Sequence, residues 1–240
     1  DLLVCSENCS YCVIKRAGGK SRSKPMNQII SLISTLDSNV KTIKLVGEEV
    51  GAYGKDGDVS LLDLVKGIIN LRPDVTISFS AIHPKYFIQD YDMYVELFKI
   101  KNMSRILPIP VQSGSNSVLK AMNRDYTIEN VIGCIQSFLI VHPDVKISTD
   151  IMVGFPTESW DDFLLSKLLV EELPLVALEC FKYDDMKGMG DCVDESEKKK
   201  RLEIIALTFI HQYCKGHNIT NSTAFYNYIK GNKIPINVNI

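Results

Sequence analysis

The sequence predicts an α/β fold in which helices cover a parallel sheet. Three observations support this prediction: 240 residues with 45% hydrophobic content can bury a sizeable core, short β-branched runs recur along the chain, and amphipathic helical segments separate them. Alternation of about six strand–helix units favours parallel strands, either doubly wound or bent into a barrel. The strands are expected over residues 2–4, 42–46, 75–81, 105–111, 145–153 and 175–181.

Local start signals mark the helices between these strands. Pro25 suits the first turn of a helix, and Ser60 with Asp63 three residues later forms a capping-box pattern in front of an apolar face. Ser115 and Thr127 can each cap a further helix. The other helices are expected over residues 86–99, 160–173 and 198–213.

Composition argues against binding to nucleic acid or membranes through a strong net charge. Lys and Arg total 27 against 29 Asp and Glu, so a nucleic acid would have to bind a local patch. No apolar run approaches the roughly 18 residues of a membrane span. The first residues, Asp1-Leu2-Leu3-Val4, lack the features of a targeting peptide. Seven cysteines argue against a secreted disulfide framework, so a reducing cytoplasm is the expected location.

Three cysteines stand close together directly after the first predicted strand. Cys5, Cys9 and Cys12 have the spacing of one metal site. Structural zinc requires four ligands, and no fourth Cys or His follows at a useful distance. An iron–sulfur cluster of four irons held by three protein thiolates would leave one iron open to a small molecule. Three thiolates therefore favour a cluster, with zinc as the alternative.

The pattern Cys-x-x-x-Cys-x-x-Cys, with Tyr11 before the last cysteine, resembles the signature of the radical SAM superfamily. This resemblance implies a site-differentiated 4Fe-4S cluster on Cys5, Cys9 and Cys12 whose open iron binds S-adenosyl-L-methionine (SAM). One electron from the cluster would cleave SAM to a 5'-deoxyadenosyl radical that abstracts hydrogen from the substrate. The implied fold is a partial (β/α)6 radical SAM barrel over residues 1–215, with residues 216–240 as a tail or truncated appendage.

Further segments narrow the resemblance to the methylthiotransferases. The family's His-Leu-Pro motif is Pro108-Ile109-Pro110 in this chain, and Thr157 replaces an expected glycine. The segments similar to that family are residues 44–54, His83-Pro84, 110–124 with Tyr126-Thr127, 149–158 and 181–183.

The resemblance implies SAM contacts at several strand ends. Gly47 and Glu48 would meet the SAM amine, although a turn with surface acids is the alternative. Gln112 and Ser113 would meet the ribose; capping alone is the alternative, and it suits Ser115 better than Gln112.

Four further residues are implied in the same site. Arg124 would pair with the SAM carboxylate through its two-pronged guanidinium, although a lone Arg can also be a solvated surface charge. Asp150, Gly154 and Phe155 would form the strand end where adenine packs against backbone. A buried Asp among apolar neighbours is costly unless it is paired, which favours a functional role.

The substrate implied by resemblance is a tRNA adenosine near the anticodon, methylthiolated with a second SAM as methyl donor. Alternatives are a protein or peptide side chain, or a non-catalytic metal-binding scaffold. The family also implies an electron donor such as flavodoxin or ferredoxin. A second 4Fe-4S cluster would belong to a domain not found in these 240 residues, and no RNA-binding β-barrel is recognisable.

Basic residues and the other cysteines complete the sequence-based hypotheses. A phosphate-binding patch is expected from Lys15, Arg16, Lys20, Arg22 and Lys24, and from the 198–201 run, for which a solvated helix start is the alternative. Cys134 is expected in the core. The widely spaced thiols of Cys180, Cys192 and Cys214 are expected to be unrelated to one another.

Overall fold

A computed structural model describes residues 5–14, 21–190, 193–217, 219 and 237–238. By its internal contacts the chain divides into two compact units, and each is considered by itself below. Unit 1 comprises Asp1–Ile109 with Glu129–Val145, and unit 2 comprises Pro110–Ile128 with Lys146–Ile240. The predicted boundary at 215/216 stays a prediction.

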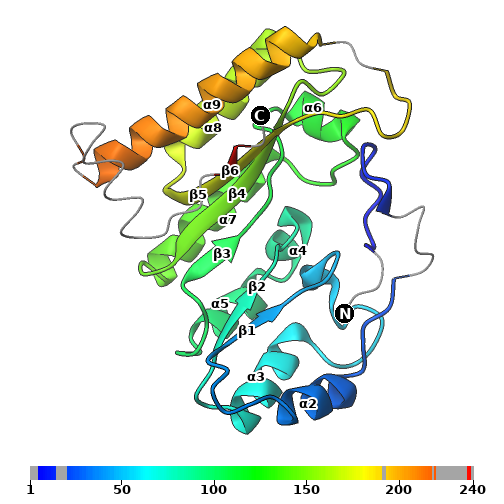
Figure 1. Ribbon diagram of the computed structural model, residues 1–240, viewed down its shortest axis with the longest axis vertical. Coiled ribbons are helices and arrows are strands. Elements are labelled where there is room, and N and C mark those ends of the chain that lie inside the picture. Colours follow the sequence, from blue (N-terminus) through cyan, green and yellow to red (C-terminus); the bar gives the residue numbers. More distant parts are fainter. Residues whose placement is uncertain (1–4, 15–20, 191–192, 218, 220–236, 239–240) are drawn as a thin grey trace. The chain divides into compact units, whose positions relative to one another are not determined.

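Unit 1 places short parallel strands against helices (Figure 1). Strands β1 and β2 pair in parallel register from Thr42–Thr76 to Leu45–Phe79, and a parallel bridge between Ile77 and Met103 continues the pairing towards β3. The elements are α2 (Met26–Ser34), β1 (Thr42–Leu45), η1 (Val50–Ala52), α3 (Leu61–Leu71), β2 (Thr76–Phe79), α4 (Pro84–Gln89), α5 (Tyr91–Phe98), β3 (Ile106–Pro108) and α7 (Ile128–Val141).

The core of unit 1 is partly aromatic. The ring of Phe138 on α7 lies 5.5 Å from that of Phe87 and 5.3 Å from that of Phe98 between ring centroids, in edge-on geometry that favours such pairs. All three are essentially inaccessible to solvent. These rings pack α4, α5 and α7 against one another.

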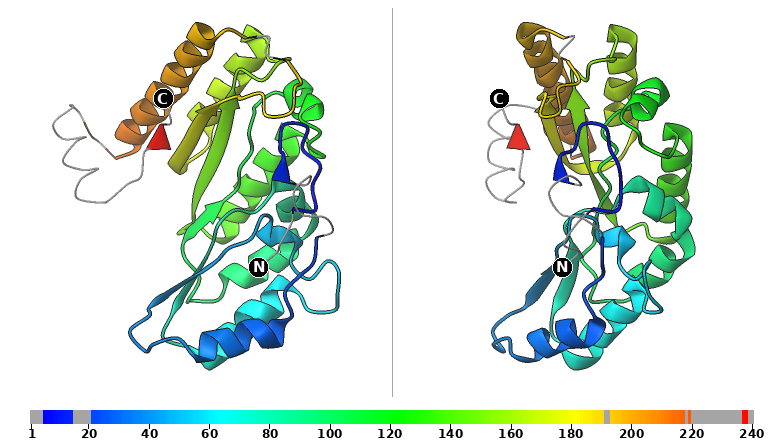
Figure 2. Two further views of the ribbon diagram at one scale, coloured as in Figure 1. Left: turned by 45° about the vertical axis from the view of Figure 1, so that its right-hand side comes forward. Right: turned by 90° about the vertical axis from the view of Figure 1, so that its right-hand side faces the viewer.

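Unit 2 is built on longer strands. Strands β4 and β5 run parallel and side by side in both views of Figure 2, from the Ser148–Ala177 pair to the Val153–Lys182 pair, and β6 pairs parallel to β5. Helices α8 and α9 pack against each other, and α9 packs on β5 (Figure 1). The elements are α6 (Asn116–Ala121), β4 (Lys146–Val153), α8 (Trp160–Glu172), β5 (Leu175–Lys182), α9 (Glu195–Gly216) and β6 (Asn237–Val238).

The predicted class, α/β with parallel strands, is confirmed by the strand pairing. Ser60 and Asp63 form the expected capping box, and the Ser115 hydroxyl accepts from the Val118 N–H as expected of a cap. Leu202, Ile205 and Phe209 of α9 are buried. The predicted strand at 2–4 lies outside the described residues.

Two element boundaries were wrong. The helix expected over 86–99 is two helices, α4 and α5, because the chain turns at Asp90, whose carboxylate pairs with Lys55 at 2.6 Å. The strand expected over 105–111 shrinks to Ile106–Pro108. Pro108 and Pro110 have no N–H to donate to a neighbouring strand, which limits ladder pairing here.

The basic run at 198–201 was also predicted wrongly in part. Lys198 and Arg201 are buried, with exposed fractions of 1% and 5%, whereas Lys199 and Lys200 are exposed. One helical turn separates Lys198 from Arg201, so both point inwards from the same face of α9. Half of this run is therefore internal structure and cannot contribute to a phosphate-binding surface.

None of the helices in the described part of the chain combines the length and the hydropathy that a membrane span requires.

Candidate functional site

The three predicted cluster ligands lie on one loop of unit 1. Cys5, Cys9 and Cys12 are not in disulfide bonds; Cys9 is buried and the other two are half-buried. The Cys12 N–H donates to the Cys9 carbonyl at 3.2 Å, which folds the end of the loop into a turn. The Glu7 N–H points at Cys5 Sγ at 3.4 Å, a contact typical of sulfurs that bind metal clusters.

The environment of these thiols shows what a bound group would have to supply. The pKa of the Cys5 thiol is raised to about 11, chiefly by burial and also by the nearby Glu49, Cys9 and Glu7 side chains, against the hydrogen bond from the Glu7 N–H. A cationic metal cluster would be needed to keep such a thiol deprotonated at neutral pH. In the described residues no three His, Cys, Asp or Glu side chains form a group that could hold a metal ion. In a 4Fe-4S cluster each thiolate would bind a different iron, so the three thiols need not meet at a single metal ion. The three cysteines of this loop therefore fit such a cluster.

A tyrosine of α4 anchors this loop. The Tyr86 hydroxyl donates to Glu7 Oε1 at 2.6 Å, so the Ser6 hydroxyl, 2.7 Å away, must donate to Tyr86. Burial and the bond to Glu7 raise the pKa of Tyr86, which keeps the phenol a donor. Lys85 Nζ adds an ion pair with Glu7 at 3.4 Å. Both residues between Cys5 and Asn8 are thus held by the start of α4, which the sequence did not indicate.

The end of β1 places a different acid inside than the sequence suggested. Gly47 is half-buried and Glu48 is exposed, whereas Glu49 is buried. Glu49 Oε1 accepts the N–H of Gly51 at 2.8 Å and that of His83 at 3.1 Å. Glu49 therefore joins the loops after β1 and β2, as a charge-assisted link between two backbone segments. Two adjacent glutamates in the sequence gave no basis for telling them apart.

In unit 2, Gln112 has two features that are rare in a well-satisfied core. Its φ is +76°, in the left-handed region, which is energetically unfavourable for a residue with a side chain. Gln112 is only 5% exposed, and its Oε1 lacks a hydrogen-bond partner in the described residues. Its backbone bridges to β4, with the Gln112 N–H donating to the Asp150 carbonyl at 2.7 Å. A buried acceptor without a partner next to strand ends fits a ligand that brings a hydroxyl, as the predicted ribose contact requires.

Ser113 is placed differently. It is fully buried, and its hydroxyl lies 3.3 Å from that of Ser166 on α8 and accepts the Ser115 N–H at 3.2 Å. The backbone of Gly114 comes so close to α8 that a Cβ there would lie 2.4 Å from the Leu165 carbonyl oxygen. Ser113 thus serves the contact between α6 and α8.

Arg124 is a buried guanidinium in unit 2, not a solvated charge. Its Nη2 donates to the Pro110 carbonyl at 2.8 Å, its Nε donates to the Tyr126 hydroxyl, and the guanidinium lies 5.3 Å from the centre of the Tyr126 ring. The Tyr126 hydroxyl donates in turn to the Val111 carbonyl at 2.7 Å. These bonds fix the segment before Gln112.

Asp150 is the acid in the middle of β4. Burial and the neighbouring Glu179 raise the pKa of Asp150 to about 6, while the positive charge of Arg124 opposes them. Its carboxyl is therefore poised between the neutral and ionised forms near neutral pH, as is common in binding sites. Of the predicted SAM contacts, the structure brings Gln112, Arg124 and Asp150 together in unit 2.

Gly154 and Phe155 form the turn that leaves β4. Gly154 has φ +75°, and its N–H donates to Glu158 Oε2 at 2.7 Å. Phe155 is fully buried, with its ring edge-on to Tyr183 at 5.4 Å. The φ explains why glycine stands here, because a side chain would strain this conformation.

Several predicted features lie elsewhere or outside the described residues. Tyr11 is half-buried on the cysteine loop of unit 1. Cys134 is half-buried on α7, less enclosed than the expected core position, and Cys180 is buried in β5. Lys15, Arg16, Lys20 and Cys192 lie outside the described residues.

Comparison with known families tests the resemblance that the cysteine loop suggested. A family model described as the radical SAM superfamily matches residues 3–168, well over half of the chain. The chain belongs to the radical SAM superfamily. The resemblance predicted from the cysteine spacing is confirmed.

Curated relatives of this chain are tRNA-modifying enzymes by name. The chain is 36% identical over 180 residues to a probable threonylcarbamoyladenosine tRNA methylthiotransferase of Methanothermobacter thermautotrophicus, covering 75% of this chain and 42% of that protein. It is 35% identical over 211 residues to the tRNA-2-methylthio-N(6)-dimethylallyladenosine synthase of Thermoanaerobacter pseudethanolicus, covering 83% and 44%. The chain thus spans less than half the length of these relatives.

Solved structures share the fold of this chain. Methylornithine synthase matches with a TM-score of 0.59 at 13% identity, covering 86% of this chain and 60% of that one. Streptococcus suis SuiB bound to its precursor peptide SuiA matches with a TM-score of 0.59 at 15% identity, covering 98% and 51%. At these identities the likeness concerns the fold, and it confirms the predicted partial radical SAM barrel.

Removing the Tyr86 hydroxyl is expected to loosen the radical SAM cysteine loop. In Tyr86→Phe both Ser6 and Glu7 lose a partner, and a hydrogen bond to a charged group contributes about 2 kcal/mol. We expect a lower thermal midpoint and less iron bound per chain after anaerobic reconstitution. Tyr91→Phe, which removes a hydroxyl on α5, is the matched control. Equal iron content in Tyr86→Phe and Tyr91→Phe would contradict the anchoring role.

Proposed function

We propose that this chain is the catalytic core of a methylthiotransferase-type radical SAM enzyme that modifies a tRNA adenosine. The observation that carries the proposal is the loop that carries three cysteine thiols, Cys5, Cys9 and Cys12, in a chain that matches the radical SAM family. When bound, a 4Fe-4S cluster on these thiolates would supply the electron that cleaves SAM. The non-catalytic metal-binding scaffold receives no comparable support.

The protein's own contribution is to bind and orient. Cys5, Cys9 and Cys12 would hold the cluster, and Tyr86 fixes the loop between them. In unit 2 the unpartnered Oε1 of Gln112 and the ionisable Asp150 carboxyl would meet polar groups of SAM. The complete set of proposed SAM contacts is Tyr11, Gly47, Glu48, Gln112, Ser113, Arg124, Asp150, Gly154 and Phe155.

Within this set the contacts differ in support. Gln112 and Asp150 have unsatisfied or ionisable groups available to a ligand. Ser113 and Arg124 already bond within the protein, so their contribution to SAM binding would be through the backbone they position. Glu49 and Glu158 join the set as supports that the sequence did not suggest.

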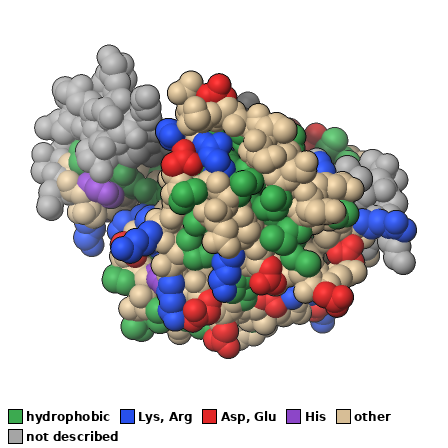
Figure 3. Space-filling view, turned by 90° about the horizontal axis from the view of Figure 1, so that it is seen from below, with side chains coloured by type: hydrophobic (Ala, Val, Ile, Leu, Met, Phe, Trp, Pro, Cys, Tyr) green, Lys and Arg blue, Asp and Glu red, His purple; other side chains and the backbone are tan. Residues whose placement is uncertain are grey.

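The tRNA substrate is supported by the names of the relatives, whose domains extend beyond this chain. The face shown in Figure 3 mixes Lys and Arg with Asp, Glu and apolar side chains, so it offers no uniformly basic surface for RNA. Recognition of tRNA would then depend on a local patch or on further domains. A cytoplasmic location, a flavodoxin or ferredoxin electron donor, and a second 4Fe-4S cluster on a further domain complete the proposal.

Replacement of a cluster ligand tests the proposal most directly. Cys9→Ala should lose iron and the ability to form 5'-deoxyadenosine, because each thiolate is one of three protein ligands. Cys134→Ala, on α7, is the control and should keep both. Iron content and product would be measured after anaerobic reconstitution. Full iron and product in Cys9→Ala would sink the cluster assignment, and a colourless wild-type protein with one zinc would favour the scaffold alternative.

Protonation of Asp150 should control SAM affinity. The pKa of about 6 in the folded protein means that the carboxyl is neutral below and ionised above this pH. SAM carries a sulfonium and an ammonium cation, so its affinity should rise as pH increases through about 6. Asp150→Asn should remove this dependence and weaken binding at neutral pH by about tenfold.

A neighbouring variant provides the control for Asp150. Glu179→Gln removes a negative charge that raises the Asp150 pKa, so the rise in affinity should move to lower pH. Calorimetric titration across this pH range measures both effects. An unchanged affinity and pH profile in Asp150→Asn would remove Asp150 from the SAM site.

Salt dependence distinguishes an RNA substrate from a peptide. If Lys15, Arg16 and Lys20 contact phosphates, replacing all three with Ala should flatten the log–log salt slope of tRNA binding by roughly two to three units. Lys199→Met, at an exposed position, should change the slope by about one unit at most. A chain that binds no tRNA at low salt, even with the further domains present, would favour the protein or peptide substrate.

A further inference from the structure

The turn after β4 in unit 2 is surrounded by buried charged side chains that the SAM contacts do not explain. Lys198 is 1% exposed, and the side chains of Arg201 and Glu158 are 6% and 0% exposed. Burying charges is costly, and a buried ion pair adds little stability compared with apolar residues of similar size. Such an arrangement is therefore better explained by the geometry that it imposes than by stability.

The first contact is between Lys198 and Gly154. A Cβ built on Gly154 would lie 2.4 Å from Lys198 Cγ, so the aliphatic stem of the lysine packs directly on the glycine backbone. The ammonium group donates to the Tyr183 carbonyl at 3.1 Å and pairs with Glu195 at 3.0 Å. Lys198 thus fills the space beside Gly154 and connects it to the end of β5.

The second contact runs through Glu158. Its Oε2 accepts the Gly154 N–H at 2.7 Å and the Arg201 guanidinium at 2.7 Å. The same guanidinium donates to the Glu158 carbonyl at 3.0 Å and pairs with Glu197 at 3.1 Å. Arg201 therefore binds both the backbone carbonyl and the carboxylate of Glu158, the residue that accepts the Gly154 N–H.

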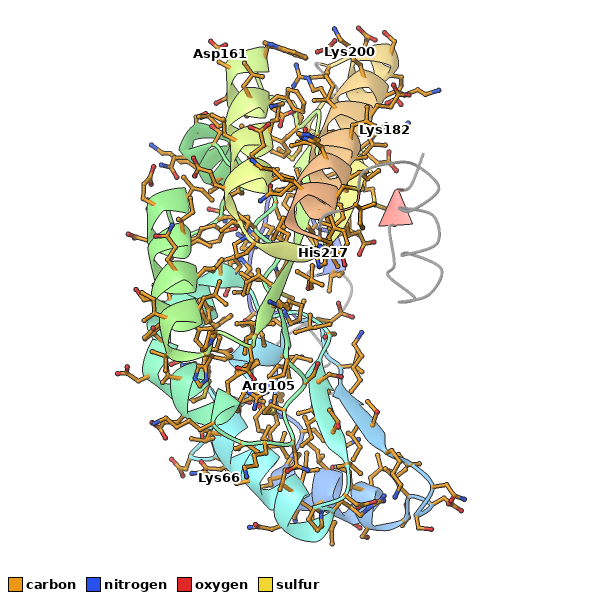
Figure 4. The ribbon with its side chains drawn as sticks, turned by 90° about the vertical axis from the view of Figure 1, so that its left-hand side faces the viewer. Lys66, Arg105, Asp161, Lys182, Lys200 and His217 are labelled. Carbon is orange, nitrogen blue, oxygen red and sulfur yellow. The ribbon has the colours of Figure 1, made fainter. Side chains whose placement is uncertain are left out.

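Helices α8 and α9 begin at the same end of the pair, as the labelled Asp161 and Lys200 show in Figure 4. Trp160, the one tryptophan in the sequence, opens α8 with its ring 5.7 Å from the Arg201 guanidinium and 5.1 Å from Lys200 Nζ. Its fluorescence therefore reports on the Arg201 contact without any added label.

We propose that Lys198 and Arg201 of α9 are positioning residues for SAM, acting through Gly154 and Glu158 to hold the left-handed turn against which adenine packs. This inference rests on the proposed function, which places adenine at Gly154 and Phe155. Neither residue touches SAM in this proposal. They fix the backbone that does, so they control affinity and leave the cluster unaffected.

The test compares SAM affinity in reconstituted wild-type protein and two variants, Lys198→Met and Arg201→Met. Methionine keeps the length of an unbranched stem and removes the charge. Both variants should bind SAM about tenfold more weakly at unchanged iron content and unchanged far-ultraviolet circular dichroism. Lys199→Met, one residue along the same helix and exposed, should bind as wild type does.

A purely structural role would lower the unfolding midpoint but leave the affinity of the folded protein unchanged. In Arg201→Met the Trp160 emission should shift, which verifies that the contact is lost. The double variant Glu158→Gln with Arg201→Met leaves no unpaired charge at the fully buried position 158 and keeps a carbonyl oxygen for the Gly154 N–H, so it should recover affinity relative to Arg201→Met. It also keeps the proposal testable should Arg201→Met fail to fold.

The outcomes separate the two proposals. Wild-type affinity in folded Lys198→Met would overturn the positioning role of Lys198. A double variant that binds SAM no better than a weakened Arg201→Met would overturn the positioning role of Arg201. Wild-type affinity in Arg201→Met with a shifted Trp160 emission would overturn it as well. A reconstituted wild-type protein that binds iron but no SAM would overturn the proposed function, and the positioning role with it.

Discussion

Parallel pairing is the constraint on which the rest of this structure depends. Parallel strands cannot be joined by tight turns, so each must be reached through a crossover, and their carboxyl ends share one edge within a sheet. The apolar middle of a buried strand does not tolerate polar groups without partners. Two of the proposed SAM contacts accordingly lie just beyond strand ends, Gly47 after β1 and Gly154 after β4.

Each unit fixes such a strand end with a buried carboxylate that accepts a glycine N–H. Glu49 accepts from Gly51 in unit 1, and Glu158 accepts from Gly154 in unit 2. Neither glycine has room for a Cβ, which would lie 2.8 Å from the Glu49 carboxylate and 2.4 Å from Lys198 Cγ respectively. Charge-assisted hydrogen bonds of this kind define the path of a loop more sharply than apolar contact, because they depend on direction.

Several charged residues of this chain therefore act as buried structural links and do not form a charged binding surface. A net charge of −2 provides no general attraction for RNA, and two of the four basic residues at 198–201 serve the interior. Unit 1 carries the cysteine loop and unit 2 most of the proposed SAM contacts.

The sequence by itself determined the features that depend on neighbours along the chain. The cysteine spacing, the capping box of Ser60 and the alternation of strands and helices are local, and they were sufficient for the family and the α/β class. Tertiary structure alone decided which of two adjacent glutamates is buried, that Tyr86 anchors the cysteine loop, and that Lys198 and Arg201 turn inwards. These outcomes depend on partners that are distant in sequence, such as Glu158 for Arg201 and Glu7 for Tyr86. A residue type states what a side chain can bind, but burial and the position of its partner are set only when the elements pack together.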